Sequence, residues 1–138
     1  MKTAMPNIKH NYHALLAVMT GTLLLVSLAY AVPAPTPPAQ HGDAAHGKAL
    51  YQSCEACHSI EENDIGPKHR GVVGRHAGSV TGYAYSPALK ASGITWDEAT
   101  LNAWLTNPSA LVPGTKMFFK IDDSQARADI IAYLKELK

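Results

Sequence analysis

The chain has 138 residues, a formal net charge of +1 and 46% hydrophobic residues, which leaves room for one modest domain beside a strongly apolar N-terminal stretch. From Val32 onward, ten Lys and Arg residues stand against eleven Asp and Glu residues. No block of basic residues is present to neutralise phosphates, so the composition excludes a nucleic-acid-binding protein.

The N-terminal stretch predicts a segment directed to a membrane. Residues 14–32 read ALLAVMTGTLLLVSLAYAV, carry no charge and follow two lysines. The A-Y-A at residues 29–31 fits a signal-peptidase site, which makes residues 1–31 a signal peptide, but the apolar run is also long enough for an uncleaved N-terminal membrane anchor. Residues 32–41 are a proline-rich linker. Both interpretations predict a periplasmic domain, soluble or tethered to the inner membrane.

The first predicted helix precedes the two cysteines of the chain. Apolar or small residues recur at the spacing i, i+3, i+4 and i+7 in Gly47, Leu50, Tyr51 and Cys54, and Asp43 is a suitable N-cap. We expect the cysteine pair to end this helix. Residues 65–82 contain five glycines, too many for a regular element, and predict a loop that wraps around something.

Three more helices are predicted after this loop. Ser86-Pro87 begins a short helix that Gly93 ends, and a capping box at Thr95-x-x-Glu98 begins the next, which stops at Asn107-Pro108. Residues 107–120 are predicted to form a loop, and the last helix begins near residues 122–124 with an apolar stripe. That stripe consists of Ile130, Tyr133, Leu134 and Leu137. The predicted fold class is all-α, with few aliphatic residues to form a core, so we expect something else to fill its centre.

The stretch SCEACHSI contains Cys54, Cys57 and His58. A disulfide across this short span would stabilise little, a thioredoxin-type dithiol needs a strand–helix–strand unit, and a structural zinc ion needs a fourth ligand. C-x-x-C-H is the signature of covalent c-type haem attachment and accounts for all three residues. The haem, one per chain, would also supply the missing core.

The residue opposite His58 determines the kind of haem protein. With His58 as the proximal iron ligand, Met117 is the one methionine outside the leader, and it lies in a loop far along the chain from the haem motif. A thioether is a common second ligand of electron carriers. His69 and His76 are rival ligands, although both lie among basic or glycine-rich residues and are expected to be exposed.

Four motifs, CEACH, GPKHRGVVGR, GYAYSPALKASGITW and NPSALVPGTKMFF, occur in this order, and residues 42–138 resemble a class I cytochrome c of the bacterial respiratory or photosynthetic type. The resemblance implies N- and C-terminal helices that cross near Gly47, Tyr51, Ile130 and Tyr133, with loops wrapped around one covalent haem. Gly47 would permit close approach of the two backbones.

The resemblance also implies roles for individual residues. It gives His58 and Met117 as axial ligands, and Pro67 as the residue whose carbonyl accepts the His58 N–H. Three further residues match positions that hydrogen-bond the haem propionates, namely Arg75, Tyr85 and Trp96. The chain departs from the family pattern at Lys68-His69-Arg70, where relatives are less basic.

The expected function is therefore one-electron transfer and not enzymatic catalysis. The predicted partners are transient redox proteins: a cytochrome bc-type complex, a terminal oxidase or a photosynthetic reaction centre. Two alternatives stay open. The domain could be a permanent haem subunit of a larger dehydrogenase or oxidase, or a peroxidase or gas-binding protein with an open sixth position, which Met117 argues against.

Overall fold

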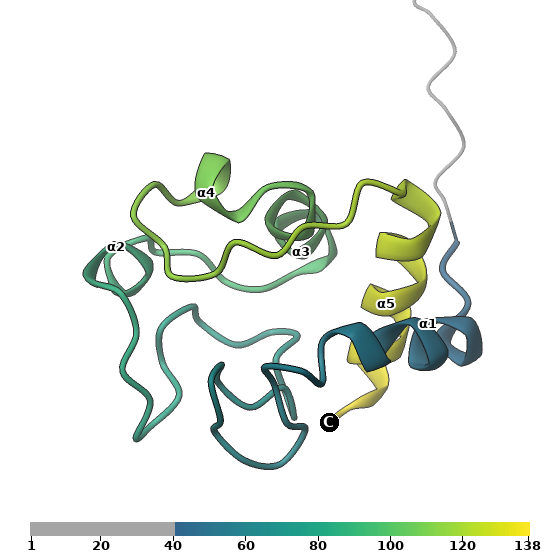
Figure 1. Cartoon of the computed structure of the whole chain (residues 1–138), viewed down its shortest axis with the longest axis horizontal. Coiled ribbons are helices and arrows are strands. Elements are labelled where there is room, and N and C mark those ends of the chain that lie inside the picture. The colour runs from purple at the N-terminus through teal and green to yellow at the C-terminus, as the bar shows by residue number, and fades with distance from the viewer. Residues whose placement is uncertain (1–40) are drawn as a thin grey trace, which may run out of the picture. The chain divides into compact units, whose positions relative to one another are not determined.

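The computed structural model describes residues 41–138; the predicted leader or anchor and all of the predicted linker except residue 41 lie outside them. The described chain is helical, as predicted, and it has no strand beyond an isolated bridge between His76 and Thr95 (Figure 1). The longest stretch without a helix covers residues 54–86. In chain order the helices are α1 (Ala44–Leu50), the 3₁₀ turn η1 (Tyr51–Ser53), α2 (Pro87–Lys90), α3 (Glu98–Thr106), α4 (Pro108–Leu111) and α5 (Ser124–Glu136).

Helices α1 and α5 cross closely, and Gly47 is the residue that permits this. A Cβ atom placed on Gly47 would lie 1.9 Å from the carbonyl oxygen of Asp129, so any side chain there would force the helices apart. About one helical turn further along the contact, the rings of Tyr51 and Tyr133 pack edge to face with centroids 5.3 Å apart. The predicted crossing of the first and last helices is confirmed.

The buried carboxylate of Asp129 stabilises the crossing of α1 and α5 through hydrogen bonds. The side chain of Asp129 is 2% exposed and accepts hydrogen bonds from the Asp43 backbone N–H at 2.7 Å, His46 Nδ1 at 2.7 Å and Gln125 Nε2 at 2.8 Å. The Asp43 N–H, then His46 and Gln125, hold the pKa of Asp129 below its ordinary value because they favour the charged form. Asp43 is also the N-cap of α1, as predicted, so one short segment both starts α1 and joins it to α5.

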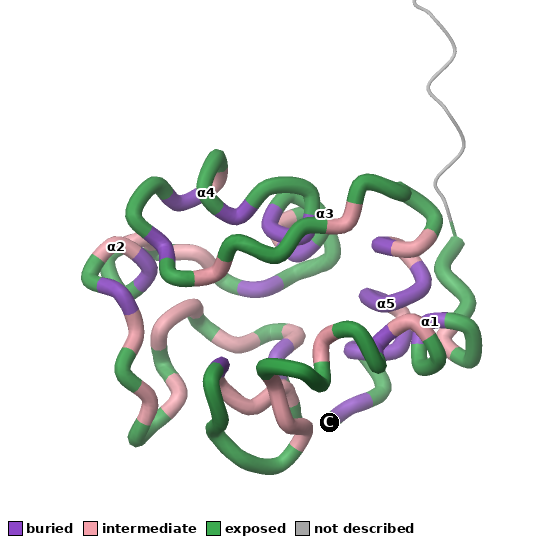
Figure 2. Tube along the Cα trace, in the orientation of Figure 1, coloured by how far each residue is buried: buried purple, intermediate pink, exposed green. Residues whose placement is uncertain are grey.

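The core lies among α1, α3 and α5, while the loop between η1 and α2 contributes little to it (Figure 2). The three stripe residues on α5 and Leu137 at its C-cap are all buried, as predicted. Between residues 54 and 82, by contrast, Val72 is the one buried hydrophobic side chain. A segment of this length with a single apolar anchor needs another partner to hold its shape.

Two local predictions about the helices are wrong. The cap of α3 is Asp97, whose carboxylate accepts from the Thr100 N–H while Thr100 Oγ1 accepts from the Asp97 N–H. Thr95 does not form this box because its hydroxyl bonds His76 Nδ1 at 2.9 Å. The predicted loop after Asn107 contains α4, since the Asn107 side chain caps a new helical turn at the Ala110 N–H. No helix among residues 41–138 is long and apolar enough to cross a membrane.

Candidate functional site

The two cysteines lie where η1 passes into the long loop. The backbone N–H groups of Cys57 and His58 both donate to the Cys54 carbonyl, at 3.0 and 2.9 Å, so the C-x-x-C-H segment forms one tight turn. Cys54 is half-buried, Cys57 is exposed, and no disulfide joins them. Burial raises the pKa of the Cys54 thiol. Both sulfur atoms are therefore free to react with another group.

The imidazole of His58 is oriented by the loop that follows it. His58 Nδ1 lies 2.7 Å from the Pro67 carbonyl oxygen, which can only accept, so Nδ1 carries the proton and the lone pair is on Nε2. Gly66 lies directly against the ring, because a Cβ there would come within 2.2 Å of it. Burial lowers the pKa of His58 and favours the neutral ring. This is the arrangement of a histidine ready to bind a metal through Nε2.

His69 packs on the imidazole ring of His58, and the sequence did not predict this contact. Its imidazole stacks on that of His58 with centroids 4.0 Å apart and planes inclined by 22°, and its Nδ1 lies 2.9 Å from the Tyr51 hydroxyl. Burial lowers the pKa of His69 to about 3, with smaller contributions from the charges of His58 and Arg75. The expectation that His69 is exposed is wrong. Since it packs on His58, it cannot also lie opposite His58 as a second ligand; His76 is exposed, as expected.

Met117 lies in the loop between α4 and α5. Its Sδ atom accepts a hydrogen bond from Trp104 Nε1 on α3 at 3.1 Å, and the side chain packs against the edge of the core. The sequence placed Trp104 on the buried face of α3 but gave no sign of this contact. The indole both holds the thioether in position and draws electron density from its sulfur.

Two of the three predicted propionate donors, Arg75 and Trp96, are neighbours. The backbones of Arg75 and Trp96 are joined by a hydrogen bond from the Trp96 N–H to the Arg75 carbonyl at 2.9 Å. The Arg75 guanidinium donates to the carbonyls of Lys68 and Arg70 at 2.8 and 2.9 Å, which leaves some of its five N–H groups unused. Burial raises the pKa of Tyr85, and the Val80 backbone and the charge of Arg75 partly offset this. The guanidinium, phenol and indole N–H of the three residues are donors that suit a buried carboxylate.

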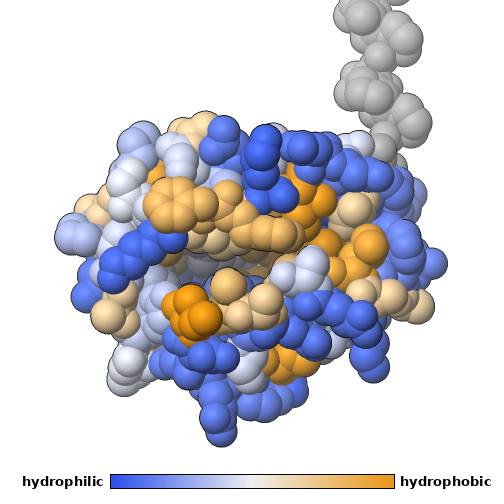
Figure 3. Space-filling view, in the orientation of Figure 1, coloured by the Kyte–Doolittle hydropathy of each residue, from blue (hydrophilic) through white to orange (hydrophobic). Residues whose placement is uncertain are grey.

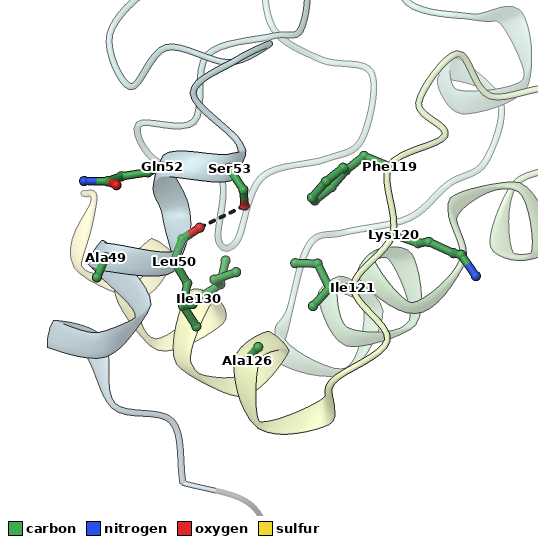
Figure 4. A pocket seen from close by; sticks show the side chains of 9 residues that line it. All are labelled: Ala49, Leu50, Gln52, Ser53, Phe119, Lys120, Ile121, Ala126 and Ile130. Carbon is green, nitrogen blue, oxygen red and sulfur yellow. Dashed lines mark hydrogen bonds between the residues drawn. The ribbon is translucent and has the colours of Figure 1, made fainter.

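The face drawn in Figure 3 is hollowed at its centre, with apolar side chains on both rims and hydrophilic ones around the edge. Three large hydrophobic residues are exposed in the described domain, namely Ile65 (71%), Phe118 (77%) and Phe119 (46%). A pocket lies between α1, η1, α5 and residues 119–121 (Figure 4). The side chains of Phe119 and Ile121 point into it toward Leu50 and Ile130, whereas Lys120 points away. Most of its lining is apolar, and the polar members are Gln52, Ser53 and Lys120.

The donor set does not fit a metal ion held by side chains alone. No group of three or more His, Cys, Asp or Glu residues in the described part of the chain could bind one. The residues do fit a planar, apolar group with carboxylate tails: two free thiols, an oriented imidazole, a thioether, an apolar hollow and a cluster of donors. The loop of residues 54–82 also lacks the internal core that such a group would provide.

Fold and site together define a class I c-type cytochrome, and comparison with known proteins shows the same. The sequence model of the family "Cytochrome c" matches residues 44–138, and the chain belongs to this family. It carries one covalent c-type haem and is an electron carrier.

Several cytochromes c are similar to this chain in sequence. The chain is 42% identical to "Cytochrome c2" of Blastochloris viridis over 111 residues, which are 78% of this chain and 87% of that protein. It is 56% identical to "Cytochrome c-550" of Nitrobacter winogradskyi over 81 residues, 56% and 74% of the two chains. Among solved structures, "cytochrome cH from Methylobacterium extorquens" is 54% identical and superposes with a TM-score of 0.67, covering 69% of this chain and 99% of that one.

Proposed function

We propose that Cys54 and Cys57 hold the haem by two thioether bonds, and that His58 Nε2 and Met117 Sδ are its axial ligands. The observation that carries the proposal is the hydrogen bond from His58 Nδ1 to the Pro67 carbonyl, because it places the proton on Nδ1 and leaves the unprotonated Nε2 free to bind iron. The haem supplies the Fe(III)/Fe(II) couple. Two axial ligands from the protein leave no position for a substrate, which agrees with electron transfer and not with catalysis.

The chain's own residues set the driving force of this electron transfer. A methionine thioether favours the reduced iron, and the Trp104 N–H strengthens that preference by withdrawing electron density from the sulfur. Arg75, Tyr85 and Trp96 would neutralise and hydrogen-bond the propionates, which keeps these carboxylates ionised inside the domain. A rigid set of ligands also means that little reorganisation accompanies each change of oxidation state.

Replacing Met117 by alanine tests the proposed ligation. The variant holoprotein is expected to lose the sulfur-to-iron charge-transfer band of the oxidised form. Its reduction potential is expected to fall by roughly 0.1–0.3 V, a share of the ~0.8 V range over which axial ligands set haem potentials. Optical spectra and redox titration measure both. Phe118→Ala, at the neighbouring exposed position, is the matched control and should keep the band. A Met117→Ala protein with an unchanged spectrum would refute the ligand assignment.

A smaller change is expected for Trp104→Phe. The phenylalanine ring occupies most of the indole volume but removes the N–H that Met117 accepts. A hydrogen bond of this kind contributes about 0.5–1 kcal/mol, so the potential should fall by roughly 20–40 mV while methionine ligation is retained. Redox titration measures the shift, and the charge-transfer band checks ligation. A rise in potential would show that the hydrogen bond acts in the opposite sense.

We further propose that the domain of residues 42–138 works in the periplasm, with residues 1–31 as signal peptide or anchor and residues 32–41 as linker. Its partners are redox complexes, with a cytochrome bc-type complex as donor and a terminal oxidase or photosynthetic reaction centre as acceptor. Permanent attachment to a larger dehydrogenase or oxidase is the alternative. Three exposed apolar side chains favour a small, transient contact. These two possibilities are distinguished by purifying the native protein and determining whether it is isolated alone or in a complex.

The near-neutral domain predicts that docking depends little on salt. Ten basic residues oppose eleven acidic ones from Val32 onward, so long-range steering by net charge is weak. The second-order rate of reduction by membranes of the host organism should change less than about threefold between low and physiological ionic strength. Stopped-flow absorbance measures it. A fall of tenfold or more would show that a local charged patch steers docking in spite of the neutral total.

A further inference from the structure

His69 is the feature that the proposed function leaves without a role. It lies in the three-residue stretch where the sequence departs from the family pattern, yet it packs inside the domain, on the ring assigned as proximal ligand. Its backbone N–H donates to the Ser59 carbonyl at 3.0 Å, and the next N–H, of Arg70, donates to the Ile60 carbonyl at 2.8 Å. The two bonds fix His69 to the segment that directly follows His58.

The His69 ring is itself held at its far edge. The Tyr51 side chain is buried, and its hydroxyl has no hydrogen-bond partner in the described domain other than His69 Nδ1, at 2.9 Å. A buried hydroxyl needs an acceptor, so Tyr51 donates and His69 accepts, with the His69 proton on Nε2. The Tyr51 ring in turn packs edge to face against Tyr133 of α5. A continuous chain of contacts thus runs from the helix crossing to His58.

The His58 ring is therefore fixed at three places. Its Nδ1 edge is bound to the Pro67 carbonyl, Gly66 lies against the ring, and His69 stacks on it with an inclination of 22°. An aliphatic side chain would fill the same space but would not impose one ring orientation. A planar ring anchored by its own hydrogen bond does impose one, because the stacked pair must stay nearly parallel.

We propose that His69, anchored by Tyr51, is a positioning residue that sets the rotation of the His58 imidazole plane about its bond to iron. The inference rests on the proposed ligation by His58. The orientation of an axial imidazole decides which iron orbital holds the unpaired electron of the oxidised form. His69 thereby determines how that electron is distributed over the haem edge from which it is transferred.

Three substitutions in the holoprotein test this role. His69→Leu keeps an apolar side chain but removes the stacked ring and the acceptor; His69→Phe keeps a ring without the acceptor; Tyr51→Phe removes one hydroxyl oxygen. His76→Leu is the matched control, since His76 is exposed and bonds Thr95 instead. The readouts are the haem-methyl proton shifts and the g-values of the oxidised protein, which report the ligand plane and do not respond to stability as such.

His69→Leu is expected to change the order and spread of the four haem-methyl resonances, and His69→Phe to change them less. Tyr51→Phe should shift them in the same direction, and it should add nothing in the His69→Leu background because both act through one ring. His76→Leu should leave the pattern unchanged. If His69→Leu does not fold, Tyr51→Phe alone decides the outcome.

A haem-methyl pattern in His69→Leu or Tyr51→Phe that overlays the wild type would overturn the positioning role. Failure of the ligation itself is distinguishable, because the oxidised wild-type protein would then lack the low-spin histidine–methionine spectrum before any substitution is made. A wild type with that spectrum and variants without a shift would refute the inference about His69 alone.

Discussion

Replacing both Cys54 and Cys57 by alanine is expected to give a chain that keeps no haem through denaturation and does not reach the native fold. Between residues 54 and 82 only one hydrophobic side chain, Val72, is buried, so this loop has almost no core of its own. The free energy of unfolding of a native domain is only about 5–15 kcal/mol. Loss of the haem, against which residues 54–82 are expected to pack, should therefore remove most of that stability.

Mass spectrometry of the denatured protein measures the covalent attachment. Each thiol adds across a vinyl group of the haem without losing atoms, so the wild-type chain should carry the full mass of one haem and the double variant none. Each single variant should retain haem through its remaining thioether. Ser53→Ala, at the exposed neighbouring position, is the matched control and should retain it as well. Haem that stays attached in the double variant would refute the assignment of both sulfurs.

Gly47→Val is expected to destabilise the domain by about 3 kcal/mol or more. Valine favours a helix slightly more than glycine does, so local propensity predicts a small gain. The Cβ would, however, meet the Asp129 carbonyl at 1.9 Å, and separation of α1 from α5 would also strain the hydrogen bonds that Asp129 accepts. Overpacking costs about 1–3 kcal/mol and each lost hydrogen bond about 1 kcal/mol.

Chemical denaturation followed by circular dichroism measures this change. Ala45→Val is the matched control, because Ala45 lies on the exposed side of the same helix and reports only helix propensity, about 0.5 kcal/mol. A Gly47→Val protein with a denaturation midpoint close to that of the control would contradict the close crossing of α1 and α5.

Features that depend only on residues close together in the sequence could be predicted from it. Asp43 and Ser86 cap their helices as predicted because a cap needs only a side chain that reaches its own backbone. The stripe on α5 is buried as predicted, since its period alone defines one face. The C-x-x-C-H motif likewise predicts its cofactor from five consecutive residues.

Apart from α4, which Asn107 caps locally, the errors lie where a residue distant in sequence supplies the partner. Thr95 had the spacing of a cap, but its hydroxyl bonds His76, nineteen residues away, and Asp97 takes the cap. His69 looked exposed because its neighbours are basic, and only the folded loop shows that Tyr51 provides a buried donor for it. Trp104 is buried, as predicted, but its hydrogen bond to the Met117 sulfur depends on a loop thirteen residues further along and was not predicted. Composition does not report such pairs.

The contact between α1 and α5 has a consequence for the order of events during synthesis. The Asp43–Asp129 hydrogen bond joins residues 86 positions apart, and α5 is the helix on which α1 mainly packs in the described domain. A chain made from its N-terminus therefore presents α1 and both thiols long before α5 exists to cover that side. The contact between α1 and α5 is therefore expected to form late, and both thiols are expected to stay accessible to haem until it does.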